Sequence, residues 1–192
     1  MDYFLVLEDM DLKSDRIFKI PNFTNYSKLL NKYDFDYSKA LNDEFLIVEE
    51  DFNLKKYKDF YGDKFPIISE KFHGFFKEFF EEVVFKNVIV TDNIITSQFR
   101  YYYPVLDKVD CLSSKTKVNS FNEDIDINKL INLDINMVRE IILDKEKLKK
   151  LDLDAFYIEN FKKDYMVVNL YIAEMILRNN LEGIKLKRLK LD

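Results

Sequence analysis

The sequence is poor in the residues that build several common kinds of functional site. It has one cysteine, one histidine, three glycines and no tryptophan among 192 residues. A single cysteine, Cys111, cannot form an intrachain disulfide, and with one histidine it cannot make a zinc site. The glycines at 62, 74 and 183 are too far apart to build the glycine-rich loops that bind nucleotide phosphates. These shortages argue against a disulfide-stapled, zinc-binding or nucleotide-dependent protein.

Long apolar runs and an excess of positive charge are missing as well. No apolar segment approaches membrane-spanning length, and the first residues are acidic where a secretion signal has basic residues. We therefore expect a cytoplasmic protein without a membrane anchor. The net charge of -5 argues against a general nucleic-acid binder and favours a basic partner. The content of 47% apolar and 34% charged residues fits a globular chain that buries a sizeable core.

Two segments a hundred positions apart share one pattern. The first reads FPIISEKFHGFFKEFF and the second reads YMVVNLYIAEMILRNN. In each, an apolar stretch ends at a residue that can cap a helix, Ser69 or Asn169, and a helix with an apolar stripe follows. We predict two similar strand–helix–strand units at about 65–90 and 165–190. The core is expected to contain Phe72, Phe76, Ile172 and Ile176.

Side-chain alternation and β-branching indicate the other elements. Strands are expected at YFLVLE, EFLIVEE, VVFKNVIV, FRYYYPVL, MVREIIL, DAFYIEN and IKLKRL. Helices are expected at YSKLLNKY and, after a cap at Asp144, at KEKLKKL, while DFNLKKYKDFYGDK and CLSSKTKVNSFNEDIDIN are predicted to be connections. Pro104 should confine its strand to an edge or a bend, and Gly183 should end the helix of the second unit. Lys185 and Lys187 are typical of an exposed sheet edge.

This order of elements predicts an α+β fold, in which helices pack on a mixed or antiparallel sheet. The chain, residues 1–192, is expected to form a single domain. Gly62 ends a polar connection and marks a candidate boundary. That boundary would divide an N-terminal appendage or subdomain, residues 1–62, from a core of residues 63–192.

The core segment resembles a family of immunity proteins from bacterial polymorphic-toxin systems, the family numbered eleven in that series. The resemblance is carried, in order, by PIISEKFHGFFKEF, VVFKNVIV, YYYPVLDKVDCLSS, REIILDKEKLKKL, DAFYIEN and YMVVNLYIAEMILRNNLEGIKLKRL. The chain departs from the family at Asn169, where serine is commoner, and in the acidic FYIEN. The resemblance implies a protein that is made beside a toxin, binds it in the producing cell and blocks it by steric occupation. It carries over no catalytic residue.

Two acidic clusters and a tyrosine-rich strand form the candidate partner interface. Its residues are Glu49, Glu50, Asp51, Glu123, Asp124, Asp126, Tyr101 and Tyr103. The carboxylates would steer a basic toxin cleft, and the tyrosines would supply apolar anchors. Solvated loop ends and core packing are the ordinary alternatives for the same residues. The second cluster lacks the glycine and the distal glutamate of a calcium loop.

Three function classes remain open at this point. The first is an immunity protein whose partner is a cognate toxin domain, with no nucleic acid, membrane or cofactor involved. The second is a small hydrolase that uses paired carboxylates, and the third is a regulatory protein-binding domain unrelated to toxins. His73 and Cys111 are expected to be structural, because neither has a partner at catalytic or ligand spacing. We therefore assign no catalytic, cofactor-binding or metal-binding residue.

Overall fold

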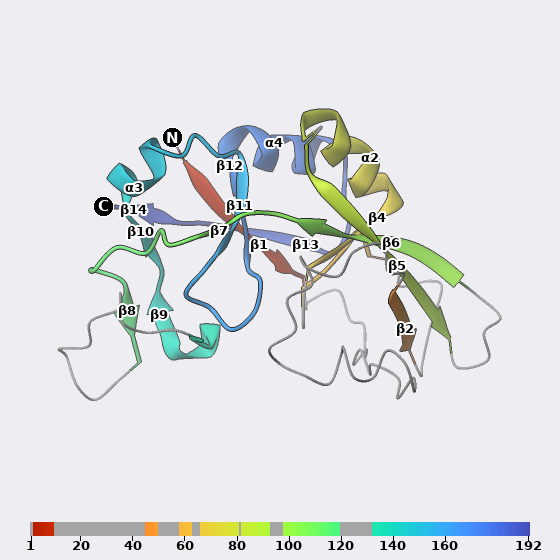
Figure 1. Ribbon diagram of the computed structural model, residues 1–192, viewed down its shortest axis with the longest axis horizontal. Helices are drawn as coiled ribbons and strands as arrows, with labels where there is room; N and C mark the ends of the chain where they lie inside the picture. Colours follow the sequence, from red (N-terminus) through yellow and green to blue (C-terminus); the bar gives the residue numbers. More distant parts are fainter. Residues whose placement is uncertain are drawn as a thin grey trace.

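The computed structural model describes residues 2–9, 45–49, 58–62, 66–80, 82–92, 98–119 and 132–192. These residues form an α+β fold, as predicted, with two five-stranded sheets and three α-helices gathered toward one side (Figure 1). Sheet A contains, in spatial order, β13 (Ile184–Arg188), β1 (Tyr3–Glu8), β12 (Met166–Asn169), β11 (Ala155–Ile158) and β7 (Lys108–Val109). Sheet B contains β2 (Phe45–Glu49), β5 (Val84–Asp92), β6 (Gln98–Val105), β4 (Ile67–Ser69) and β3 (Phe60–Tyr61).

The remaining described strands form two short ribbons. In one, β10 (Ile142–Leu143) pairs with β14 (Lys190–Leu191), and in the other, β8 (Lys117–Val118) pairs with β9 (Val138–Glu140). The helices are α2 (Glu70–Phe79), α3 (Lys145–Lys149), α4 (Leu170–Arg178) and the 3-10 turn η4 (Ile135–Met137). Asp144 caps α3, as predicted, by accepting hydrogen bonds from the amides of Glu146 and Lys147.

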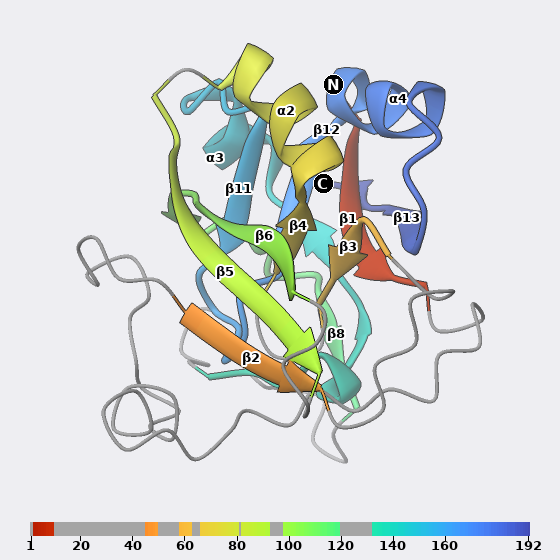
Figure 2. The ribbon, with the colours of Figure 1, turned by 90° about the vertical axis from the view of Figure 1, so that its right-hand side faces the viewer.

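Each of the two similar segments forms a split strand–helix–strand unit, so the predicted duplication is confirmed. In sheet B, β4 and β5 both run antiparallel to β6, which lies between them, and α2 connects the two outer strands. In sheet A, β12 and β13 flank β1 in the same way, and α4 connects them (Figure 2). The units occupy two sheets rather than one. They also differ in chain order. The middle strand β6 follows β4, α2 and β5 along the chain, whereas the middle strand β1 precedes β12, α4 and β13.

A hydrogen-bonded aspartate completes each unit. Ser69 and Asn169 cap their helices as predicted, each accepting a hydrogen bond from the amide of the third helical residue, at 3.1 and 2.9 Å. Each cap also donates from its side chain to an aspartate that precedes a strand: Ser69 to Asp59 at 2.5 Å, and Asn169 to Asp154. The backbone amide of each cap donates to the carbonyl of the same aspartate, at 2.9 and 2.8 Å. The two helix starts are therefore fixed by the same set of contacts.

The middle strand of each unit repeats this correspondence. Tyr101 pairs with the cap Ser69, and Tyr3 pairs with the cap in the other unit. Tyr101 meets Tyr61 edge-on at 5.4 Å between ring centroids, and Tyr3 meets Phe156 in the same manner at 5.7 Å. Tyr61 and Phe156 each lie two residues after the aspartate that binds the helix cap of their unit. The duplication therefore extends from the helix into the packing of aromatic rings across each sheet.

The helices α2 and α4 lie side by side and run in opposite directions (Figures 1 and 2). Near the start of α2, Lys71 donates from its ammonium to the carbonyl of Asn180, just beyond α4, at 2.9 Å. Near the start of α4, the ring of Tyr171 meets Phe79 at the end of α2, with centroids 5.5 Å apart. These reciprocal contacts relate the two units by an approximate two-fold axis between the helices.

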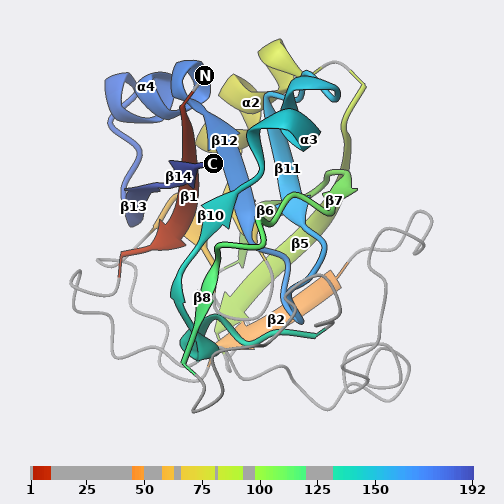
Figure 3. The ribbon, with the colours of Figure 1, turned by 90° about the vertical axis from the view of Figure 1, so that its left-hand side faces the viewer.

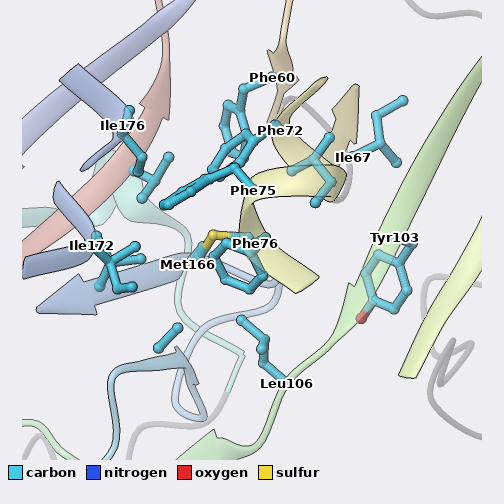
Figure 4. Packing of buried hydrophobic residues seen from close by; sticks show 14 of the residues in the cluster. Phe60, Ile67, Phe72, Phe75, Phe76, Tyr103, Leu106, Met166, Ile172 and Ile176 are labelled. Carbon is cyan, nitrogen blue, oxygen red and sulfur yellow. The ribbon is translucent and has the colours of Figure 1, made fainter. Parts of the chain in front are cut away.

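One hydrophobic core joins α2 and α4 to both sheets (Figure 4). The four predicted core residues are at most 1% exposed, which confirms their placement: Phe72, Phe76, Ile172 and Ile176. A second core lies across sheet A, because alternate residues of a strand face opposite sides. On β11, Ala155 and Tyr157 belong to the first core, whereas Phe156 and Ile158 belong to the second. Sheet A is thus buried on both faces.

The candidate boundary at Gly62 does not separate the described N-terminal residues from the rest. β1 lies inside sheet A, where it pairs with both β12 and β13. Lys58 and Asp59, which precede β3, are each 2% exposed, and the Asp59 amide donates to the carbonyl of Glu182 at 2.8 Å. β1 and residues 58–62 are therefore integral to the core, and β2 pairs with β5 in sheet B. The predicted helix YSKLLNKY lies outside the described residues.

The strand predictions hold with several differences, one of which is that β7 and β14 form outside every predicted strand. β3 and β8 form inside segments predicted to be connections. MVREIIL divides into β9 and β10, because β9 pairs with β8 and β10 pairs with β14. β6 is an interior strand, so of the two alternatives predicted for Pro104, an edge or a bend, the edge is wrong. Pro104 fits there because the neighbouring β4 pairs with Tyr101 and Tyr102 and does not reach it. β13 forms an edge of sheet A among the described strands, as its lysines predict.

Gly183 does not end the helix, because α4 stops at Arg178 and is capped by Asn179. Gly183 instead has a φ of 76°, a conformation that glycine adopts without strain. A Cβ atom at this position would lie 2.7 Å from Cβ and Cγ of Lys58. The glycine therefore allows the segment after α4 to approach the residue that precedes Asp59.

Candidate functional site

The two acidic clusters adjoin, along the sequence, elements that lie on one side of the molecule. Glu49 is the last residue of β2, while Glu50 and Asp51 lie outside the described residues. The second cluster, Glu123, Asp124 and Asp126, also lies outside them, in the segment between β8 and β9. β2 and the β8–β9 ribbon are placed away from the layer of α2 and α4 (Figures 1 and 3). The described elements that adjoin the two clusters in the sequence therefore lie on the side of the fold opposite these helices.

Tyr101 and Tyr103 are core residues, which corrects their assignment to the partner interface. They are 1% and 2% exposed, because their face of β6 points into the first hydrophobic core. The Tyr101 hydroxyl donates to the carbonyl of Lys58 at 3.0 Å, and the Tyr103 hydroxyl donates to Asp164 at 2.8 Å. Core packing, the ordinary alternative for these residues, is what the structure has. Neither tyrosine offers surface to a partner.

A buried polar cluster joins the N-terminal strand to both units. The ammonium of Lys58 contacts Glu8 Oε1 at 2.9 Å and donates to the carbonyl of Asp9 at 3.0 Å. The second oxygen of Glu8 accepts from the amide of Gly62 at 3.2 Å. The second oxygen of Asp59 accepts from the amide of Glu182 at 2.7 Å. The cluster therefore links segments that are distant in the sequence.

This cluster has the residue types of a catalytic site but not the arrangement. A serine nucleophile needs a base that can take its proton and a free oxygen that can attack. Ser69 Oγ donates to Asp59 and accepts from the amide of Phe72, so the oxygen is held at the helix start. Ser69 is also 0% exposed. The arrangement is therefore that of a helix cap, and the role of Asp59 is to orient it.

A second polar cluster lies where β11 meets β6. The Tyr157 hydroxyl donates to the carbonyl of Pro104 at 2.5 Å, and Asp164 forms an ion pair with Lys108 at 2.9 Å. Burial raises the pKa of Tyr157 well above its usual value, and neighbouring Tyr103 and Asp164 raise it further. The phenol therefore stays neutral and serves as a hydrogen-bond donor between the sheets.

Cys111 and His73 have structural surroundings. Cys111 is 0% exposed, and burial raises the pKa of its thiol to about 12, so the reactive thiolate does not form near neutral pH. The ring of His73 stacks on Tyr102 at 3.8 Å and meets Phe85 edge-on at 4.5 Å between centroids. In the described ranges, no three or more His, Cys, Asp or Glu residues are grouped to hold a metal ion.

The surroundings of His73 predict a pH dependence of stability. Burial lowers the pKa of His73, and the nearby Lys77 lowers it further. The unfolded chain therefore binds a proton at higher pH than the folded chain, so the free energy of unfolding should fall as pH drops below about 6.5. We expect His73→Gln to lose less stability than the wild type between about pH 7.5 and 5.5, measured by urea unfolding. Identical losses in the two proteins would contradict this assignment.

Comparison with known proteins adds no relative. No protein-family model, no curated protein and no solved structure matches the chain. The resemblance to the immunity family therefore rests on the order and spacing of the motifs. Among the helices in the described ranges, none is long and apolar enough to cross a membrane.

Proposed function

We propose that this chain is a non-enzymatic immunity protein, which binds a cognate bacterial toxin in the cytoplasm of the producing cell and neutralises it by steric occupation. The observation that carries the proposal is the ordered set of motifs that resembles the immunity family numbered eleven. PIIS and YMVV contain most of β4 and β12, and the helices that follow are capped by Ser69 and Asn169. The motifs of the resemblance are thus the elements on which both units are built.

The state of the reactive side chains is consistent with a binding role. The Ser69 hydroxyl, the Cys111 thiol and the Tyr157 hydroxyl are each buried, and the two hydroxyls make hydrogen bonds that hold the fold. Groups used in this way stabilise structure and are not presented to a substrate. A protein that acts by occupation needs only a surface that matches its target.

The acidic clusters are the proposed steering surface for this toxin. A toxin that acts on nucleic acid carries a basic cleft, and opposite charges accelerate encounter. Steering of this kind weakens with salt, because the Debye length is about 8 Å at physiological ionic strength. We place the cluster Glu123, Asp124 and Asp126 ahead of the cluster that begins at Glu49, because it belongs to the longer connection.

Replacing Glu123, Asp124 and Asp126 together by lysine tests this surface. The association rate with the toxin encoded beside the chain should fall by about tenfold or more at low salt, and the difference should shrink at physiological salt. The matched control replaces Glu70, Glu78 and Glu82 by lysine, which changes the net charge equally on exposed positions of another region. Equal rates for a folded triple variant and the wild type would remove the connection from the proposed interface.

Stoichiometry tests the mode of action separately. If inhibition is by occupation, toxin activity should fall in proportion to added protein and reach its minimum near one equivalent. Isothermal titration of the same pair should give the same ratio. Complete protection far below one equivalent, or turnover of a substrate by the purified protein, would contradict a binding-only function.

A further inference from the structure

The exposed face of α4 is unusually apolar for a surface helix. Leu170, Tyr171 and Leu177 are 42%, 54% and 66% exposed. The other exposed residues of this helix are Glu174 and Arg178. Three of the five exposed side chains are therefore large and apolar, and contiguous apolar surface of this kind marks contact sites more often than isolated residues do.

The internal duplication supplies a matched reference for this face. Aligning the helices at their caps pairs the exposed residues of α4 with residues of α2 that are exposed as well. The corresponding residues of α2 are Glu70, Lys71, Gly74, Lys77 and Glu78. In α2, the five equivalent exposed positions are therefore all occupied by charged residues or glycine. Tyr171 packs in part against Phe79, but the fold does not require Leu170 and Leu177 to be apolar, so these leucines need another explanation.

The charges of this face favour contact with an identical surface. Glu174 and Arg178 form an ion pair with each other at 3.2 Å, so the exposed face of α4 has no net charge. The chain as a whole carries a net charge of -5, and two copies would repel each other through an acidic face. Contact through α4 avoids that repulsion. A strongly basic partner, by contrast, gains little attraction from a neutral face.

The spacing of the leucines makes the face self-complementary. Leu170 and Leu177 are seven residues apart, which places them on one side of the helix, two turns from each other. If two α4 helices cross antiparallel about a two-fold axis near Glu174, Leu170 of one copy lies beside Leu177 of the other, twice over. We propose that the exposed face of α4 is the contact between two copies of this chain. Such two-fold contacts are the commonest form of homo-oligomer.

The contact is small, so the dimer is weak. Stable interfaces bury about 1,200–2,000 Å² in total, and three apolar side chains from each copy cover less than that. The dissociation constant is expected in the range of about 10–100 μM, which makes the assembly dependent on concentration. The half-buried Phe79, which contacts Tyr171, extends the apolar surface toward α2.

Sedimentation velocity of the purified full chain tests this directly. Between about 1 μM and 1 mM protein, the weight-average mass should rise from 23.2 kDa toward twice that value. Leu177→Glu and Tyr171→Glu should each shift the midpoint at least about tenfold to higher concentration, because a buried charge opposes the contact. The matched control is Lys77→Glu, at the equivalent exposed position of α2, which should leave the midpoint unchanged. Thermal melting confirms that each variant is folded.

Two results would overturn the proposal. The first is a monomer at every concentration up to about 1 mM, and the second is a dimer that neither Leu177→Glu nor Tyr171→Glu weakens. If the chain is monomeric and Leu177→Glu weakens binding to the toxin, the toxin covers this face and a second copy does not. The experiment uses the chain alone, so its outcome does not depend on the proposed immunity function.

Discussion

Phe76→Ala is expected to lower the free energy of unfolding by about 3–5 kcal/mol. The substitution opens a cavity in the interior of the core, where the surrounding side chains can fill the space only in part. Phe76 is 0% exposed and lies in the cluster that joins α2 and α4 to both sheets (Figure 4). Its ring centroid is 4.3 Å from that of Phe80 and 5.6 Å from that of Phe72. The ring also meets Phe85 of β5 edge-on, with centroids 6.2 Å apart, so its loss removes contacts both within the helix and with sheet B.

Urea unfolding of Phe76→Ala and of Lys77→Ala measures the effect and its control. Lys77 follows Phe76 in the same helix and is exposed, so its truncation should change stability by no more than about 0.5 kcal/mol. A loss below about 1 kcal/mol for Phe76→Ala would show that the surrounding rings collapse into the space, and the shared core would then be less rigidly packed than its burial indicates.

Local features of the fold were predictable from the sequence because they depend on neighbouring residues. Ser69, Asp144 and Asn169 were identified as helix caps because a cap accepts from an amide two or three residues ahead. The apolar stripes placed Phe76 and Ile176 in the core for the same reason. These contacts are set within one turn of helix, where spacing alone carries the information.

Strand neighbours were not predictable in this way. Nothing near YFLVLE indicates that β1 fits between β12 and β13, more than 150 residues later, because pairing depends on distant partners. Tyr101 and Tyr103 are two residues apart and so share one face of β6, but alternation does not say which face of a strand a second sheet covers. The two tyrosines were therefore assigned to a partner interface, although their side chains are buried in the core between the two sheets.

The aspartates of the duplicated unit show a signal that was present and missed. Asp59 begins DFY and Asp154 begins DAF, and each aspartate binds the cap of its own unit. The distance along the chain from aspartate to cap is 10 residues in one unit and 15 in the other. Aligning the two units without gaps matches the helices, but it does not match the aspartates, because their distances to the caps differ. Allowing a hairpin of variable length before each cap would have extended the repeat to these strands.

Glu8→Ala is expected to cost about 3–5 kcal/mol, because it leaves the ammonium of Lys58 buried without its carboxylate. The side chains of Lys58 and Glu8 are 2% and 12% exposed, and their charged atoms are 2.9 Å apart. The carbonyl of Asp9, at 3.0 Å from the ammonium, cannot by itself replace the solvation that the charge loses. The single substitution should therefore destabilise far more than truncation of an exposed glutamate such as Glu78, measured by urea unfolding.

The double variant Glu8→Leu with Lys58→Met separates the cost of an orphaned charge from the net value of the pair. Methionine keeps the apolar stem against which Gly183 packs, and leucine fills the place of the carboxylate. If the pair roughly offsets its own desolvation, the double variant should unfold within about 1 kcal/mol of the wild type. A double variant as unstable as Glu8→Ala would mean that the ion pair itself stabilises the junction. Nearly equal stabilities of the double variant and the wild type would mean that the pair adds little stability. Its role would then be to specify how β1 meets the segment before β3, because apolar residues could pack there in several ways.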